Sequence, residues 1–218
     1  MMIQHTSDPL SLFHSPVEHM APGATLLHGA ALTYDRDLLV AVEQITAQSP
    51  FRHMITPGGF VMSVAMTNCG EVGWVTDRTG YRYDRRDPET SRPWPRMPAC
   101  FVDCAVAAAR SAGYADFRPD ACLINRYVPG ARLTLHQDKN ERDFSQPIVS
   151  VSLGLPALFQ FGGLKRADPV RKFELLHGDV AVWGGPSRLF HHGVAKLKDG
   201  VHNVVGPTRI NLTFRGAL

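Results

Sequence analysis

The chain has 218 residues, of which 44% are hydrophobic and 20% are charged. This size and composition suit one soluble domain with its own core, and no apolar run reaches the roughly 18 residues that a membrane span requires. The net charge of +3 is too small to indicate a nucleic-acid partner, and the four cysteines include no C-x-x-C pair that would indicate a zinc ribbon or a disulfide framework. A reducing cytoplasm is therefore the expected location.

The first half of the chain predicts a leader, two helices and a region of strands between them. Residues 1–22 are polar and without hydrophobic period, so we expect a flexible leader without a signal peptide. Apolar residues at helical spacing predict a helix over 35–49, which Asp35 or Asp37 is placed to cap, and an alanine-rich run predicts a second helix over 99–113. Between the helices we expect a strand over 60–70, a turn plus a strand over 70–83, and a proline-rich loop over 84–98.

The second half of the chain consists of short strand-like runs separated by Gly, Pro or Asp. Runs of this length with regular turn signals are typical of a sandwich or a closed barrel. We therefore expect an all-β unit from about residue 120 to the C-terminus. The runs are ACLINRYV, ARLTLHQ, PIVSVSLG, ALFQFGG, KFELLHG, DVAVWGG, RLFHHGV and RINLTFRG.

A candidate metal site lies in the segment LTLHQDKNERD, residues 133–143. His136 and Asp138 are two apart, so in a strand their side chains face the same side. Alone, the pair is more typical of a strand that ends in a solvated, charged turn, and a second histidine is needed to indicate a metal site. A second histidine comes from His191 or His192, of which only one can face the same volume. Two histidines and one carboxylate leave coordination positions open and suit non-haem Fe(II), although cupin-type binding proteins share this pattern.

A candidate anion site lies in the segment RINLTFR, residues 209–215. Its alternate residues are all apolar on one face, while the other face carries Arg209, Arg215, an amide and a hydroxyl. Two arginines on one face can bind a dicarboxylate through bidentate hydrogen bonds. Asn125 and Tyr127 share a face of an earlier run and would add further donors. The alternative is an edge strand with one solvated face.

Several segments together resemble the AlkB family of Fe(II)/2-oxoglutarate dioxygenases. They are NRYVPGARLTLHQDK, SVSLGLPALFQFGGLKR, HGDVAVWGG, RLFHHGV and RINLTFR, and PGGFVMSVAMTNCGEVGW resembles that family's nucleotide-recognition lid. The resemblance runs from about residue 25 to the C-terminus. It implies an α+β, mainly β fold, a double-stranded β-helix (jelly roll) with buttressing helices. The expected dioxygenase domain spans 23–218, with a lid at about 51–98 and a jelly-roll core at about 120–218.

The resemblance assigns residues to the cofactors Fe(II), 2-oxoglutarate and O2. The iron ligands of the family correspond to His136, Asp138 and His192, which decides between the adjacent histidines. The arginine nearer the metal corresponds to Arg209, with Asn211 beside it, and the arginine at the distal carboxylate to Arg215. Asn125 and Tyr127 correspond to further 2-oxoglutarate contacts.

The resemblance also implies a pocket in which a flipped base is held between Trp74 and His136. The substrate positions are Met66, Trp74, Tyr81, Asn140 and Arg166. Each has a plain alternative, because the methionine and tryptophan suit a hydrophobic core and the tyrosine and arginine an ordinary surface. Asn140 departs from the bacterial repair members, which carry an aspartate there. A carboxylate favours a cationic methylated base, whereas an amide offers only a dipole. The other residues from Lys139 to Asp143 are expected to form a solvated turn.

The implied reaction is oxidative demethylation of N-alkylated bases, in which 2-oxoglutarate and O2 yield succinate, CO2 and formaldehyde. The expected partner is alkylated single-stranded or double-stranded DNA, with RNA as a further candidate, and the protein is expected to act as a monomer away from membranes. The basic residues expected around the pocket mouth are Arg132, Lys139, Lys165 and Arg166. Two alternatives stay open: an oxygenase acting on a protein or small molecule, and a non-enzymatic cupin-like binding protein.

Overall fold

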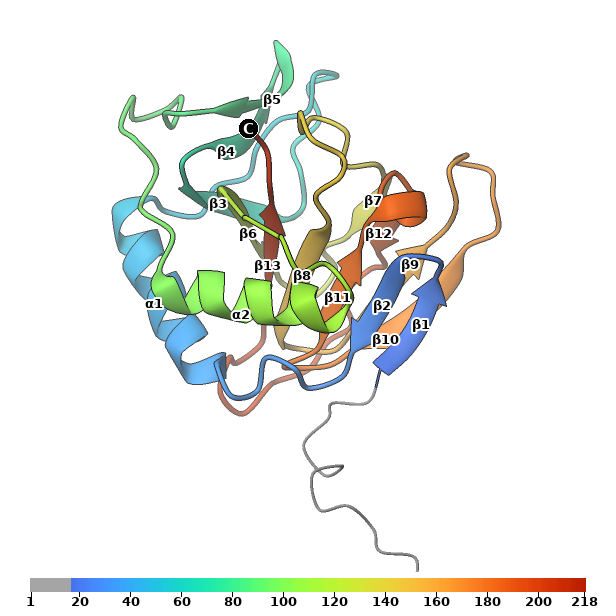
Figure 1. Cartoon of the computed structure of the whole chain (residues 1–218). Coiled ribbons are helices and arrows are strands. Elements are labelled where there is room, and N and C mark those ends of the chain that lie inside the picture. Colours follow the sequence, from blue (N-terminus) through green and yellow to red (C-terminus); the bar gives the residue numbers. More distant parts are fainter. Residues whose placement is uncertain (1–16) are drawn as a thin grey trace, which may run out of the picture.

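The computed structural model describes residues 17–218, and two sheets of antiparallel strands face each other at their centre (Figure 1). In spatial order the larger sheet contains β1 (Val17–Ala21), β2 (Ala24–Leu27), β11 (Val180–Trp183), β8 (Ile148–Gly154), β13 (Arg209–Arg215), β6 (Ala121–Tyr127) and β3 (Ala65–Gly70). The smaller sheet contains β10 (Arg171–Leu175), β9 (Ala157–Phe161), β12 (His192–Val194) and β7 (Leu133–His136). All eight strands predicted in the second half of the chain are present, in the two-sheet arrangement of a jelly roll.

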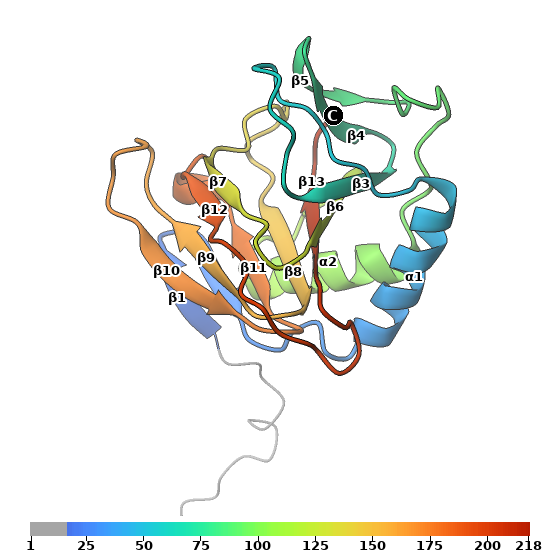
Figure 2. The same cartoon turned by 180° about the vertical axis from the view of Figure 1, so that it is seen from behind.

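Two helices cover the outer face of the larger sheet, as the view from behind also shows (Figure 2). They are α1 (Asp35–Gln48) and α2 (Ala99–Ser111), close to the predicted ranges. The apolar face of β13 packs under α2, where the ring of Phe214 meets that of Phe101 edge-on at 5.7 Å. The alternate polar residues of β13 consequently point between the two sheets. Among the described residues, no helix is long and apolar enough to cross a membrane.

A hairpin of β4 (Gly73–Asp77) and β5 (Gly80–Asp84) stands apart from both sheets, near the end of β13 (Figure 2). In its register Trp74 lies directly opposite Tyr83, and Thr76 opposite Tyr81. Directly opposed residues point to the same face of a two-stranded ribbon. The aromatic side chains of the hairpin therefore share one face.

Four expectations for the first half of the chain need correction. Val17–Ala21 of the expected leader is strand β1, paired with β2, while residues 1–16 lie outside the described part. The strand expected over 60–70 begins only at Ala65, and the segment 70–83 holds a two-stranded hairpin rather than one strand. No side chain caps α1, because the carboxylate of Asp35 accepts a hydrogen bond from the Arg36 backbone N–H and also meets the His177 ring.

Candidate active site

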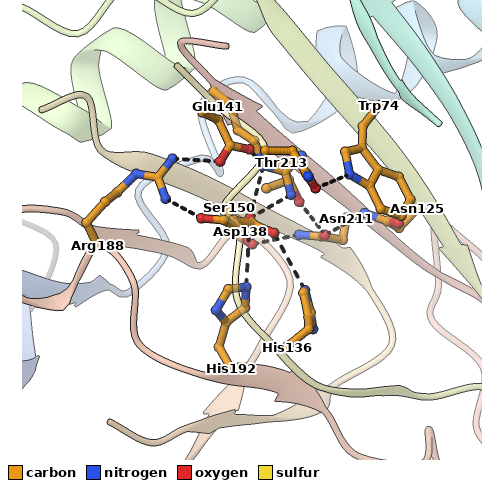
Figure 3. A network of polar contacts seen from close by, with 12 residues as sticks. Trp74, Asn125, His136, Asp138, Glu141, Ser150, Arg188, His192, Asn211 and Thr213 are labelled. Carbon is orange, nitrogen blue, oxygen red and sulfur yellow. Dashed lines mark hydrogen bonds and ion pairs between the residues drawn. The ribbon is translucent and has the colours of Figure 1, made fainter. Parts of the chain in front are cut away.

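Two neighbouring strands of the smaller sheet bring the predicted histidines together. His136 is the last residue of β7 and His192 the first of β12, and the register pairs them directly. Asp138 follows β7 and is buried, with its Oδ1 3.7 Å from His136 Nε2 and its Oδ2 3.8 Å from His192 Nε2 (Figure 3). The three ligand atoms lie within 4.8 Å of one another, so that one metal ion can contact all three. The adjacent His191 instead directs its Nδ1 to the Gly163 carbonyl, 3.2 Å away.

The backbone orients both histidine rings. The Nδ1 of His136 lies 2.8 Å from the Thr134 carbonyl, and the Nδ1 of His192 lies 3.0 Å from the Phe190 carbonyl. A carbonyl accepts only, so each Nδ1 carries the proton and each Nε2 presents a lone pair. Burial, together with the neighbouring His136, lowers the pKa of His192 to about 3. His192 is therefore neutral at physiological pH, as a metal ligand must be.

Arg215 fixes the orientation of the Asp138 carboxylate. Burial alone would raise the pKa of Asp138, but the Arg215 guanidinium and the two histidines hold it well below its usual range. The Nε and Nη2 of Arg215 donate hydrogen bonds of 2.9 and 2.7 Å to the same oxygen, Oδ2. Oδ1 is thereby left free beside His136, while Oδ2 lies between Arg215 and His192.

One cavity of about 370 Å³ contains this triad. Every predicted cofactor and substrate residue lines it, including Met66, Trp74, Tyr81, Asn125, Tyr127, Asn140, Arg166, Arg209, Asn211 and Arg215. Of the four basic residues expected at its mouth, Lys139 and Arg166 line it, whereas Arg132 and Lys165 do not. Met66 also belongs to the apolar cluster between the sheets. It is therefore both a core residue and part of the cavity wall.

The floor of the cavity is a hydrogen-bonded array on three adjacent strands, β8, β13 and β6. Asn211 donates to Ser150 Oγ at 2.8 Å and accepts from Asn125 at 3.1 Å (Figure 3). It also donates to the Val151 carbonyl at 3.0 Å. Thr213 donates to the same Asn211 oxygen at 2.9 Å. Asn211 is thus fixed from three sides. The Thr213 hydroxyl belongs to the polar face that the alternation over 209–215 predicted. Ser150 was not singled out, because a small hydroxyl residue in a strand carries no motif.

The two arginines of β13 occupy opposite ends of the cavity, which corrects the expected order. Arg215, expected at the distal carboxylate, is the one that contacts Asp138. Arg209, expected near the metal, bonds Ser152 at 3.0 Å, with its guanidinium 5.0 Å from the centre of the Tyr127 ring. Their six-residue separation spans roughly 20 Å of extended strand. The sequence resemblance identifies both arginines. It does not show which of the two lies near the metal ligands.

The aromatic hairpin closes the other side of the cavity. The ring of Trp74 stacks on that of Tyr81 with centroids 5.7 Å apart and planes inclined by 22°. The Trp74 indole N–H also donates to Asn140 Oδ1 at 3.2 Å (Figure 3). Asn68 anchors the Trp74 backbone through two hydrogen bonds of 3.0 Å. The indole is therefore oriented by contacts at both its backbone and its ring.

Glu141 and Arg188 are buried charges near the site that the sequence did not reveal. Glu141 was expected in a solvated turn, yet its side chain is only 2% exposed and lies 3.1 Å from Arg188. Arg188 also donates to the backbone carbonyl of Asp138 at 2.8 Å (Figure 3). It donates as well to the backbone carbonyl of Gln146 at 2.9 Å. A charged run in a sequence normally indicates solvent exposure, and only the fold shows that one of its members points inward.

The donor set fits the cofactors that the sequence suggested. Two neutral imidazoles and one carboxylate are the ligands that non-haem Fe(II) uses. Arg209 Nε and Nη1 and Arg215 Nη1 are buried without a hydrogen-bond partner. Buried cationic donors of this kind require an acceptor, and the carboxylates of a diacid would provide it.

Comparison with known proteins decides the family. The model of the 2OG-Fe(II) oxygenase superfamily matches residues 23–215. Over 200 residues the chain is 58% identical to the proteins named alpha-ketoglutarate-dependent dioxygenase AlkB from Salmonella typhimurium and Escherichia coli, which covers 92% of this chain and 93% of each relative. The chain belongs to the AlkB dioxygenases of this superfamily. It is thus an Fe(II)- and 2-oxoglutarate-dependent dioxygenase, and the suggested resemblance is confirmed.

The chain is also similar to a longer plant protein and to one solved structure. An Arabidopsis thaliana protein named DNA N(6)-methyladenine demethylase ALKBH1A is 33% identical over 132 residues, which is 60% of this chain and 38% of that protein. The solved structure of OsALKBH1 superimposes with a TM-score of 0.76 at 28% identity, covering 92% of this chain and 99% of that one. The expected jelly-roll fold is confirmed by this match.

Proposed function

We propose that this dioxygenase removes methyl groups from nitrogen atoms of nucleic-acid bases. The observation that carries the proposal is the shape of the cavity, which has the metal triad at one side and the stacked Trp74 and Tyr81 rings at another. A planar base fits between an aromatic ring and a metal-bound imidazole, with its edge toward the metal. The name of the Arabidopsis relative, a demethylase of methylated adenine in DNA, supports the same substrate class.

In this proposal β13 holds 2-oxoglutarate by its two carboxylates. Arg209, buried and with two unpartnered N–H groups, pairs with the distal carboxylate, and Tyr127 and Asn125 lie beside it. Arg215 uses its free Nη1 toward the end nearer the metal while its other donors retain Asp138. Each guanidinium would then have its hydrogen-bonding capacity used.

The residues of the chain position the cofactors and the base, and the bound cofactors supply the oxidation. When bound, Fe(II) with 2-oxoglutarate and O2 supplies the chemistry that releases the methyl carbon as formaldehyde and converts 2-oxoglutarate to succinate and CO2. His136, Asp138 and His192 hold the ion, and their backbone and Arg215 contacts keep the ligand atoms convergent. Trp74 keeps the base plane fixed and excludes water from the methyl group.

The partner we propose is alkylated DNA, single-stranded or double-stranded, with RNA as a further substrate. A methyl on a base-pairing nitrogen is hidden in a duplex, so the base must be flipped into the cavity, and its weakened pairing lowers that cost. Lys139 and Arg166 at the cavity wall are placed to meet the phosphates, which predicts weaker binding at higher salt. The monomeric state and the cytoplasmic location stay predictions.

A formaldehyde assay over oligonucleotides with single N-methylated bases tests the proposal. We expect 2-oxoglutarate-dependent formaldehyde from the native protein and none from His136→Ala, which loses a metal ligand. Trp74→Ala should lose at least about ten-fold in formaldehyde, the equivalent of roughly one lost stacking interaction. It should retain the slow turnover of 2-oxoglutarate to succinate that proceeds without substrate, because it leaves the triad and β13 untouched.

The combination of readouts separates the competing functions. Succinate formation without formaldehyde from any methylated oligonucleotide would indicate an oxygenase with a protein or small-molecule substrate. Unchanged demethylation by Trp74→Ala would show that the base does not stack on this ring.

A further inference from the structure

A buried chain of polar contacts runs from the aromatic hairpin to the metal-binding aspartate. The Tyr83 hydroxyl donates to Glu141 Oε1 at 2.6 Å, and the same oxygen lies 3.5 Å from Arg215 Nε. Arg215 in turn donates to Asp138 Oδ2. The Glu141, Arg215 and Asp138 side chains are all less than 10% exposed, so water does not compete for these contacts.

Arg188 makes this chain of contacts rigid. Its guanidinium lies 3.1 Å from Glu141 Oε2 and bonds the carbonyl of Asp138, so it fixes both the acid and the backbone of the ligand loop. Two carboxylates and two guanidiniums balance their charges within the buried cluster. Burial raises the pKa of Tyr83 well above its ordinary value, which keeps the phenol protonated as a donor. The phenol adds no charge to the cluster.

The chain of contacts begins beside the residue that stacks on the base. Tyr83 of β5 lies directly opposite Trp74 of β4, so the two side chains stand side by side on one face of the hairpin. They contact consecutive residues of the ligand loop, Trp74 through Asn140 and Tyr83 through Glu141. A small displacement of the hairpin therefore changes both contacts together.

We propose that Tyr83 and Glu141 are positioning residues. They link the position of the β4–β5 hairpin to the orientation of the Arg215 and Asp138 side chains. When a bound base fixes the position of the hairpin, the Tyr83 hydroxyl keeps its hydrogen bond to Glu141. Glu141 in turn keeps its contact with the Arg215 guanidinium. Arg215 then keeps the Asp138 carboxylate oriented toward the two histidines, and its own Nη1, which has no partner, is available to the cosubstrate. The inference rests on the proposed function, because it requires that a nucleotide occupies the hairpin side of the cavity.

Such a link predicts that the nucleotide and 2-oxoglutarate bind cooperatively. Coupling between two sites is reciprocal, and couplings of this kind typically change affinity about five-fold or more. Mn(II) in place of Fe(II) allows binding to be measured without turnover. We expect calorimetric titration of 2-oxoglutarate into the Mn(II)-loaded native protein to show at least about five-fold tighter binding when an oligonucleotide with 1-methyladenine is present.

Tyr83→Phe tests whether the phenol carries the link. The substitution keeps the ring and removes only the hydroxyl, and we expect the affinity ratio with and without oligonucleotide to fall to within about two-fold of unity. Tyr114→Phe is the matched control, since it removes a hydroxyl that donates a bond of 2.7 Å to the Gly23 carbonyl outside the cavity. It should lower thermal stability by a similar amount and keep the native ratio. Glu141→Gln keeps the shape of the side chain but not its charge. Its affinity ratio with and without oligonucleotide should also fall to within about two-fold of unity.

The outcomes distinguish this inference from the proposed function. A native ratio in Tyr83→Phe, or an equal loss in Tyr114→Phe, overturns the inference. A native protein that demethylates the oligonucleotide but shows no tightening of 2-oxoglutarate binding also overturns it and leaves the proposed function standing. If no methylated oligonucleotide is bound or demethylated, both are wrong.

Discussion

The Asn140 amide accepts a hydrogen bond from the Trp74 indole at the exposed side of the cavity and carries no charge toward a bound base. An amide and a carboxylate have nearly the same shape but differ in charge. The Trp74 contact would persist with an aspartate, because a carboxylate oxygen accepts the same indole N–H. Position 140 therefore affects the electrostatics of the pocket without affecting the placement of the aromatic ring.

We expect Asn140→Asp to shift substrate preference toward cationic methylated bases such as 1-methyladenine. At an exposed position, a carboxylate about 4 Å from a positive base contributes roughly 1 kcal/mol, which is about a five-fold change. The measurement is the ratio of kcat/KM for a cationic and a neutral methylated base in otherwise identical oligonucleotides.

Asn140→Ser, which keeps a neutral acceptor, should retain the native ratio and serves as the control. The shift in Asn140→Asp should also shrink with added salt. Identical lesion profiles for the native protein and Asn140→Asp would refute the electrostatic role of this position.

At the residue scale, the sequence predicted the members of the site better than their arrangement. The spacing of His136 and Asp138 and the alternation in β13 have direct physical meaning in a strand. Glu141 and Arg188 were missed because a buried ion pair looks, in a sequence, like two surface charges. The order of Arg209 and Arg215 was wrong because which end of β13 approaches the metal depends on its pairing with β8 and β6.

At the scale of elements, β13 does most to build the site. It lies between β8 and β6, and all seven of its residues are buried, which excludes the edge-strand alternative. Its apolar face forms the core under the helices and its polar face forms the floor of the cavity. One strand thus contributes to stability and to binding through alternate residues.

The two arginines of β13 should therefore have separable effects. Arg209→Met should raise the Kd for 2-oxoglutarate by at least about ten-fold, as expected for the loss of hydrogen bonds to a charged group, while Mn(II) binding stays near native. Arg215→Met leaves the buried Asp138 carboxylate without its cation, whereas Glu141 keeps its contact with Arg188. The substitution should weaken Mn(II) binding and lower the free energy of unfolding by about 3–5 kcal/mol.

Calorimetry with Mn(II) and with 2-oxoglutarate, together with chemical denaturation, measures both effects. Weak Mn(II) binding in Arg209→Met, combined with native Mn(II) binding in Arg215→Met, would reverse the assignment of the two ends.

The sequence predicted those helices and strands whose own residues show a clear local pattern. The eight strands of the second half are bounded by Gly, Pro or Asp, and both helices have clear apolar periods. The short strands β1 and β2 were missed because their stability comes from pairing with each other and with β11, which is distant in the chain. Strand order in both sheets depends on such long-range pairing and cannot be read from local patterns.

At the scale of the whole molecule, the core keeps most of the cysteine thiols away from solvent. Cys69 and Cys122 face each other across β3 and β6 and are completely buried, and Cys104 is buried in α2. Burial raises the pKa of Cys104 to about 12, so that its thiolate is absent at neutral pH. Cys100 is partly exposed, although burial and the nearby Asp37 raise its pKa as well.

We expect one thiol to react with Ellman's reagent in the native protein at pH 8, and slowly, because the thiolate is the reactive form. In denaturant all four cysteines of the sequence should react. Cys100→Ser should abolish the native reaction and leave the denatured protein with one thiol fewer. Rapid reaction of two or more native thiols would contradict the packing of α2 against the larger sheet.

The loop between β7 and β8 has an evolutionary consequence. Asp138, Asn140 and Glu141 each contact a different partner within four consecutive residues, so an inserted or deleted residue there would break the site. The residues 142–145 that follow are exposed. Exposed loop tips tolerate changes of length. Natural variation in this loop should therefore accumulate after Glu141, with the spacing from His136 to Glu141 held constant among proteins that share this chemistry.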